Sequence, residues 1–146
     1  MPSDIKFIEP EKGVYDVDFE NGDFALTDGL DTAILLSIFA EKRATRSQVE
    51  DPLKRRGHFA NEFANVEGYQ VGSTQWLFTE QAENSQSNTT QLENSIKDGL
   101  RWFVDDKICK KVNVNATQQS SGVTVNVELQ SNNKEESTYY NAFINT

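Results

Sequence analysis

The sequence has little of several residue types on which common protein chemistry depends. Cys109 is its one cysteine, which excludes an internal disulfide and a cysteine-based zinc site. His58 is its one histidine, and no carboxylates stand around it at metal-ligand spacing, so we expect a solvent-exposed loop residue. A serine or cysteine nucleophile motif and a phosphate-binding glycine loop are also missing. We therefore expect no metal, no cofactor and no enzymatic activity.

Long apolar runs are absent as well. No stretch approaches the roughly 18 apolar residues of a transmembrane helix, and the N-terminus has no signal-peptide pattern. We therefore expect a soluble protein, made in a cytoplasm, that does not enter a membrane. The formal charge of -9 and the pI near 4.6 argue against a nucleic-acid partner, whose phosphates would repel the chain. The length of 146 residues favours a single domain, 1–146.

Charge is unevenly distributed along the chain. Residues 1–31 carry nine acids against two lysines, a net charge of -7. Residues 42–58 carry six bases against two acids, a net charge of +4. Two interpretations remain open: two solvated faces, or a dipolar subunit whose ends steer toward different neighbours.

Residues 22–43 predict a strand that leads into the central helix of the fold. After Leu30 this helix is apolar around most of its circumference, which is typical of a buried helix. Thr27 and Asp28 are expected to cap its N-terminus, with Asp31 adding negative charge to the first turn.

A β-hairpin is predicted just before this helix. Apolar and acidic residues alternate up to Asn21-Gly22, a pair that favours a type I′ turn because both positions need a positive φ. The turn predicts two cross-strand pairs, Phe19 with Phe24 and Val17 with Leu26. Residues 1–12 are interpreted as an arm or a short strand.

Residues 44–72 are predicted to form a long irregular loop, of a kind usually functional or ordered by a partner. Within it, Arg55, Arg56 and Gly57 are candidate partner-binding residues, since arginine forks suit planar oxygen targets and glycine permits a tight turn. A short helix capped by Ser73 is expected to follow the loop.

The second half predicts a helix and three strands. A capping box formed by Thr90 and Glu93 is expected to open the helix, and Gly99 to weaken it slightly. Its apolar stripe consists of Leu92, Ile96, Leu100, Phe103 and Val104. Two alternating strands joined at Ser120-Ser121-Gly122 then predict a second hairpin.

The terminal strand, residues 137–146, is apolar on both faces. Tyr139 and Phe143 lie on one face, and Tyr140 and Ile144 lie on the other. We therefore predict either a central strand or one that adds to another subunit's sheet, and these four residues are candidate partner-binding residues. The predicted class is α+β, with a mostly antiparallel sheet, made of the N-terminal hairpin and the C-terminal strands, against two or three helices.

The order of several motifs resembles the Mu-type baseplate wedge proteins of contractile-tailed bacteriophages. These proteins are related to the small wedge subunits called sheath initiators, some of which are labelled "lysozyme-like". The resemblance spans roughly residues 15–130. It rests on Gly22-Asp23-Phe24-Ala25-Leu26 with Asp28-Gly29-Leu30, Thr32-Ala33, Leu35, Ser37, Phe39 and Arg43-Ala44, then Asp51-Pro52, Arg55-Arg56-Gly57, Gly72-Ser73, Trp76-Leu77, Leu100, Trp102 and Asp106.

The resemblance implies a structural virion subunit that is assembled in the host cytoplasm and located in the tail baseplate. It implies several copies around the tail axis, about six, as a closed ring would allow. The implied partners are other wedge proteins, the tail sheath protein, and tail tube or hub proteins, with Arg55, Arg56 and Gly57 as a contact loop. In this sequence His58-Phe59-Ala60-Asn61 stands where the family usually has a tryptophan-rich continuation.

The alternative is a small cell-wall glycan hydrolase of the tail. It would need two carboxylates in one cleft, one with a raised pKa. The sequence explains Asp28 and Asp31 better as helix caps, and Glu41 as a solvated helix residue. A pocket lined by paired acids and aromatic residues would favour the hydrolase.

Overall fold

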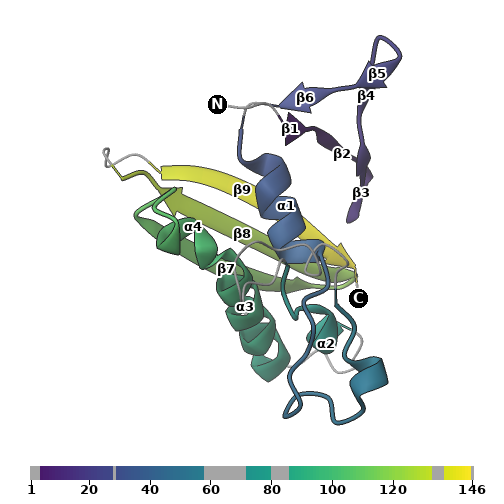
Figure 1. The fold of residues 1–146 in the computed structure, drawn as a ribbon, viewed down its shortest axis with the longest axis vertical. Coiled ribbons are helices and arrows are strands. Elements are labelled where there is room, and N and C mark those ends of the chain that lie inside the picture. The colour runs from purple at the N-terminus through teal and green to yellow at the C-terminus, as the bar shows by residue number, and fades with distance from the viewer. Residues whose placement is uncertain (1–3, 28, 58–71, 80–85, 133–136, 146) are drawn as a thin grey trace.

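A computed structural model describes residues 4–27, 29–57, 72–79, 86–132 and 137–145. It confirms the α+β class, with antiparallel sheets and helices (Figure 1). The N-terminal strands are β1 (Asp4–Ile5), β2 (Phe7–Glu11), β3 (Val14–Val17), β4 (Phe19–Glu20), β5 (Asp23–Phe24) and β6 (Leu26–Thr27). They are followed by α1 (Asp31–Phe39), the 3-10 helix η1 (Pro52–Lys54), α2 (Trp76–Thr79), α3 (Gln86–Leu100), α4 (Trp102–Asp105), β7 (Lys111–Gln119), β8 (Gly122–Gln130) and β9 (Ser137–Asn145).

The C-terminal strands form one antiparallel sheet in the order β7-β8-β9. Gln119 pairs with Gly122 across the turn between β7 and β8, which confirms the predicted second hairpin. Of the two alternatives predicted for the terminal strand, the central position is wrong, because β9 lies at the edge of this sheet and β8 lies in the middle. The valines of β8 suit that position, since β-branched side chains favour strands and central strands are the most buried.

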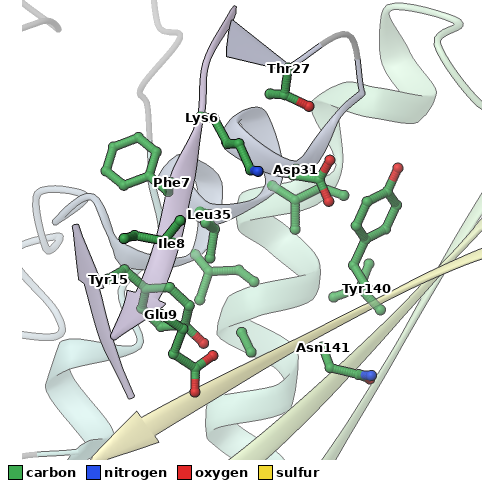
Figure 2. Close-up of a pocket in the computed structure, with 14 residues that line it drawn as sticks. Lys6, Phe7, Ile8, Glu9, Tyr15, Thr27, Asp31, Leu35, Tyr140 and Asn141 are labelled. Atoms are coloured by element: carbon green, nitrogen blue, oxygen red, sulfur yellow. The ribbon is translucent and has the colours of Figure 1, made fainter. Parts of the chain in front are cut away.

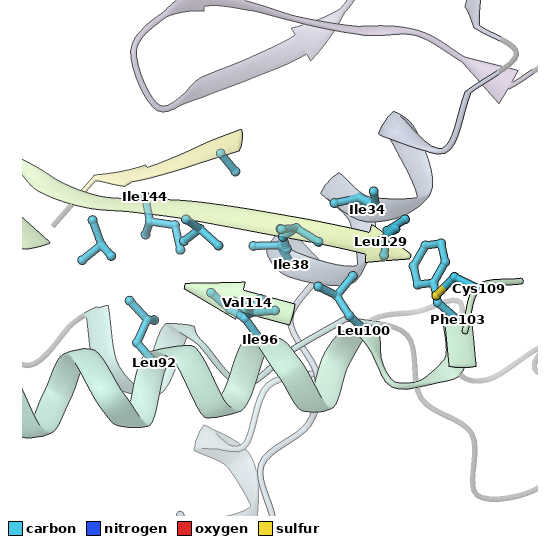
Figure 3. Close-up of a cluster of buried hydrophobic side chains, with 14 residues drawn as sticks. Ile34, Ile38, Leu92, Ile96, Leu100, Phe103, Cys109, Val114, Leu129 and Ile144 are labelled. Carbon is cyan, nitrogen blue, oxygen red and sulfur yellow. The ribbon is translucent and has the colours of Figure 1, made fainter. Parts of the chain in front are cut away.

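Helices α1 and α3 cover one face of this sheet and enclose the core (Figure 3). Burial of each large aliphatic side chain contributes about 2 kcal/mol of transfer free energy, so this layer dominates the stability. The predicted apolar stripe is divided between two helices, because α3 ends at Leu100 and α4 follows it. Leu92, Ile96 and Leu100 of α3 and Phe103 of α4 are buried as predicted, whereas Val104 is exposed. The core consists of Ile34, Ile38, Leu92, Ile96, Leu100, Phe103, Cys109, Val114, Val123, Val125, Val127, Leu129, Ala142 and Ile144.

Gly99 lies where α3 closely approaches its neighbours. A Cβ atom there would stand 2.8 Å from the backbone oxygen of Ser37 and 2.9 Å from that of Gly72. The indole N–H of Trp102 donates a hydrogen bond to the Ser37 hydroxyl at 2.9 Å, one turn further along. The glycine that weakens the helix by propensity is therefore required by the contact between α1 and α3.

Both predicted helix starts are wrong in detail. Leu30 is the N-cap of α1 and makes no side-chain capping bond, Thr27 accepts from the Gly29 N–H instead, and Asp28 lies outside the described residues. Helix α3 begins at Gln86, ahead of the predicted capping box. Glu93 instead accepts a hydrogen bond from the Ala116 N–H of β7 at 3.0 Å, because the helix packs along that strand.

Helix α1 is not buried on all sides. Ile34 and Ile38 are buried, but Leu36 keeps 43% of its surface exposed. Buried Thr32 donates its hydroxyl to the backbone oxygen of Ile5, so the helix holds β1 in place. Residues 4–5 and 7–11 are therefore paired strands rather than a free arm.

The first hairpin is confirmed at its tip, where Phe19 pairs with Phe24. The pairing of Val17 with Leu26 is wrong, because the N-terminal segment inserts between these strands. Val17 pairs with Phe7, and Leu26 pairs with Ile5. Inserted Lys6 donates its N–H to Ala25 and accepts from the N–H of Asp18. Such pairing between distant segments carries no local sequence signal.

Candidate partner-binding surfaces

The basic loop, residues 42–57, is organised by its own arginines. The Arg55 side chain donates to the backbone oxygens of Val49 at 2.8 Å and Glu50 at 2.7 Å. Arg43 donates to the backbone oxygens of Pro52 at 3.0 Å and Arg56 at 3.1 Å. These charge-assisted hydrogen bonds stabilise the loop internally. The side chain of the predicted contact residue Arg55 thus forms two hydrogen bonds within its own loop.

Arg56 and Gly57 also have structural contacts. The Arg56 guanidinium forms an ion pair with Glu41 at 2.9 Å and lies over the ring of Trp76, 4.4 Å from its centroid. Gly57 has a φ of 133°, which strains any other residue, so the predicted tight turn is present. Glu41 lies beyond the end of α1 and is not the solvated helix residue that the sequence suggested.

The most exposed apolar side chain of the loop was not predicted. Leu53 lies in η1 with 93% of its surface exposed, beside exposed Lys54. Asp51 accepts a hydrogen bond from the Leu53 N–H at 3.0 Å and caps η1. The sequence signal that could have identified Leu53 was its position as a single leucine between Pro52 and three basic residues. His58 and residues 58–71 lie outside the described residues.

The first half of strand β9 is exposed, which we call its open half, and its second half is covered by other parts of the chain, which we call its closed half. Phe143 and Ile144 are buried, whereas Tyr139 keeps 68% of its surface exposed and Tyr140 is half-buried. The Tyr15 hydroxyl accepts a hydrogen bond from the Phe143 N–H at 2.9 Å. The apolar residues on both faces of the second half of the strand are thus covered by other parts of this chain.

The turn between β2 and β3 completes that cover. Lys12 lies over the Phe143 ring, 4.3 Å from its centroid, and its ammonium reaches Gln119 at 3.0 Å. Phe143 in turn lies against Gly122, where a Cβ would approach the ring to 2.7 Å. The N-terminal turn therefore spans the end of the sheet from β9 to β7.

The open half of β9 borders a pocket of about 330 Å³ between β2, α1 and β9 (Figure 2). In Figure 2, Glu9 lies beside Tyr15 and Asp31 lies on the side of Tyr140, with Leu35 between the two groups. The lining residues are Lys6, Phe7, Ile8, Glu9, Tyr15, Thr27, Asp31, Ile34, Leu35, Ile38, Val127, Tyr140, Asn141 and Ala142.

Both tyrosines of the pocket have perturbed acidity. Burial raises the pKa of Tyr15, and the nearby Glu9 carboxylate adds to that rise. Burial also raises the pKa of Tyr140, with a further contribution from Asp31. Both phenols thus stay neutral at physiological pH.

Neither a metal cluster nor a membrane span is found in the described segments. No group of three or more His, Cys, Asp or Glu side chains gathers there that could hold an ion. Among the described helices, none is long and apolar enough to cross a membrane. Cys109 is buried, and burial raises the pKa of its thiol, as a small apolar core residue would show.

The hairpin tip is the third candidate surface. The Phe19 and Phe24 rings stack with centroids 5.2 Å apart, and they keep 62% and 47% of their surface exposed. Glu20 and Asp23 face each other beside them. The turn has the left-handed backbone that Asn21-Gly22 predicts, with φ values of 53° and 81°.

Residues 30–136 match the model of the family described as phage protein GP46. This chain belongs to the phage protein GP46 family. No curated protein matches it. The family match supports the phage origin that the resemblance implied.

One of the three candidate surfaces lies within the residues that match GP46, and two lie outside them. The match covers the chain from the start of α1 through β8, so the basic loop lies inside it. The hairpin tip and β9 lie outside it.

Proposed function

We propose that this GP46-family protein is a structural assembly subunit of a contractile phage tail baseplate, of the Mu-type wedge or sheath-initiator kind. It would link larger wedge proteins and the tail tube or hub to the first sheath ring. The family match supports a phage protein, and the motif order in residues 15–130 supports the finer assignment. The observation that carries the proposal is the open edge of β9.

The direction of the backbone groups on β9 follows from Tyr15. Paired residues in an antiparallel ladder alternate between those that exchange hydrogen bonds and those that do not. Because the Phe143 N–H reaches Tyr15, its pair with Thr124 does not exchange bonds. Asn141 and Tyr139 occupy the same alternating set, so their N–H and C=O groups also point away from β8. Within the described segments, neither the Asn141 N–H nor the Tyr139 N–H donates a hydrogen bond to a group outside the β8–β9 ladder.

An unpaired edge of this kind accepts an added strand from a partner. The strand would enter along Tyr139 and Asn141 and stop at the Tyr15 hydroxyl, which closes the remainder of the edge. Tyr139 and Tyr140 are then the contact residues of this strand, whereas Phe143 and Ile144 support it from the core.

The test removes one outward-facing N–H group. Asn141→Pro removes that donor, and an edge strand tolerates proline when its N–H faces outward. Asn141→Ala is the matched control because it changes the side chain and keeps the N–H. Each tagged chain is pulled down from cells assembling tails, and folding is checked by circular dichroism. We expect sheath and wedge proteins to co-purify with the alanine variant and not with the proline variant. Equal recovery with a folded proline variant would reject strand addition.

The pocket supports a second candidate, the tail-associated glycan hydrolase. It contains two carboxylates, Glu9 and Asp31, together with aromatic residues, which is the kind of lining that favours such an enzyme. The measurement is clearing of purified cell wall by wild type, Glu9→Gln, Asp31→Asn and the control Glu11→Gln. Clearing that only the pocket variants abolish would establish the hydrolase. No clearing by wild type, with tail proteins co-purifying, would leave the assembly role alone.

A further inference from the structure

The hairpin tip, defined as Phe19, Glu20, Asp23 and Phe24, carries an apolar surface that its own chain leaves uncovered. The stacked rings are held side by side by the β4–β5 pairing. Contiguous exposed aromatic surface on a soluble domain usually marks an interaction site. The tip is therefore built to contact another surface.

The charge of the tip specifies the sign of that surface. Glu20 and Asp23 are directly opposed and exposed, which is an unfavourable like-charge pair. Lys6 forms an ion pair with Asp18 instead, at 3.7 Å. Within the described segments no basic side chain forms an ion pair with Glu20 or Asp23. A basic partner would relieve this repulsion.

A surface of the complementary kind exists on the same chain. Leu53 projects from the basic loop with 93% of its surface exposed, and Arg46 and Lys54 are exposed on the same loop. Over the residues that the structure describes, neither base forms an ion pair. An arginine can also stack on an aromatic ring, which the exposed phenylalanines of the tip would permit.

The two surfaces cannot meet within one molecule. In Figure 1, β4 and β5 lie at one end of the long axis, and the blue-green segment of residues 40–57 lies at the other end. A second copy of the chain can bring them together. A contact between two different surfaces of identical chains is heterologous and produces a ring when its rotation closes.

We propose that the hairpin tip of one copy binds the basic loop of the next copy at Arg46, Leu53 and Lys54. The Phe19–Phe24 pair covers Leu53, and Glu20 and Asp23 face the two bases. This contact gives the uneven charge of the chain a physical role, head-to-tail steering of identical subunits. It does not depend on the baseplate role, because it concerns the purified chain alone.

The test is a charge swap on the full-length chain. The tip variant carries Glu20→Lys and Asp23→Lys, and the loop variant carries Arg46→Glu and Lys54→Glu. Two control variants match their changes in net charge at exposed sites elsewhere. The first control carries Asp105→Lys and Asp106→Lys, and the second carries Lys110→Glu and Lys111→Glu. Circular dichroism verifies that each variant folds, and sedimentation equilibrium measures self-association.

We expect wild type to associate with a dissociation constant below about 1 mM in low salt, and more weakly as salt rises. Each swap variant alone should associate at least about tenfold more weakly, because like charges then face each other. An equimolar mixture of the two variants should restore association, since both contacts become complementary again. The control variants should behave as wild type.

Three results would overturn the proposal. Wild type could stay monomeric throughout, which would assign the tip to a different basic protein. Either swap variant could associate as well as wild type, or the mixture could fail to restore association. None of these results depends on whether the chain enters a baseplate.

Discussion

The Tyr15 hydroxyl accepts a hydrogen bond from the backbone N–H of Phe143, 128 positions later in the sequence, at 2.9 Å. This bond ties the N-terminal strands to the last strand and divides the edge of β9 into a closed half and an open half. The Tyr15 ring also contacts Phe39 of α1, with centroids 5.1 Å apart. One side chain thus connects three parts of the fold.

Tyr15→Phe should lower the free energy of unfolding by about 1–2 kcal/mol. The substitution keeps the ring contact with Phe39 but leaves the part-buried Phe143 N–H without its acceptor. Urea denaturation measures the change, with Tyr139→Phe as the control at an exposed tyrosine. Equal stability of both variants would show that the bond contributes nothing.

Stability should fall as pH rises above about 10, the ordinary pKa of tyrosine. Burial raises the pKa of Tyr15 and Tyr140 in the folded state, so the unfolded chain loses these protons first. Their contribution is complete below the unfolded pKa and is lost as pH rises through the folded values. Denaturation of wild type and of the Tyr15→Phe, Tyr140→Phe double variant should show a shallower alkaline decline for the variant. Parallel declines would contradict the assignment.

Gly99→Ala should destabilise the protein by about 1–3 kcal/mol, although alanine is the better helix former. The new methyl group would meet the backbone oxygens of Ser37 and Gly72, which cannot move without separating α1 from α3. Asn94→Ala, at an exposed position of the same helix, should be neutral or stabilising. Thermal unfolding of the pair measures the difference, and a stabilised Gly99→Ala variant would disprove the close approach.

Arg55→Ala should open the basic loop, because it removes the bonds to the backbone oxygens of Val49 and Glu50. We expect faster proteolysis within residues 44–57 and little change in global unfolding. Lys54→Ala, at an exposed neighbour, should leave the proteolysis rate unchanged. If Arg55→Ala instead preserved the loop and abolished partner recovery, Arg55 would be a contact residue, as the sequence suggested.

Local pattern alone was sufficient for part of this fold. The tip of the first hairpin follows from Asn21-Gly22, the second hairpin follows from two alternating strands, and the core stripe of α3 follows from its 3.6-residue period. Among the candidate residues, Tyr139 is exposed as a contact residue should be, whereas Leu53 was overlooked. Single exposed leucines are common, so Leu53 is identified only by its place on the same loop as Arg46 and Lys54, which form no ion pair within the described residues.

The sequence by itself determined the two hairpin turns and the apolar stripe of α3, because backbone periodicity and turn chemistry act over a few neighbouring residues. The tertiary structure alone decided that Lys6 inserts beside Ala25, that Glu93 bonds to β7, and that β9 lies at an edge with one half closed by Tyr15. These features depend on segments that are distant in sequence and are brought together by burial of a shared core. The hydrophobic effect is non-directional. The pattern of apolar residues therefore predicts that apolar faces pack together, but it does not predict which polar groups form hydrogen bonds next to them.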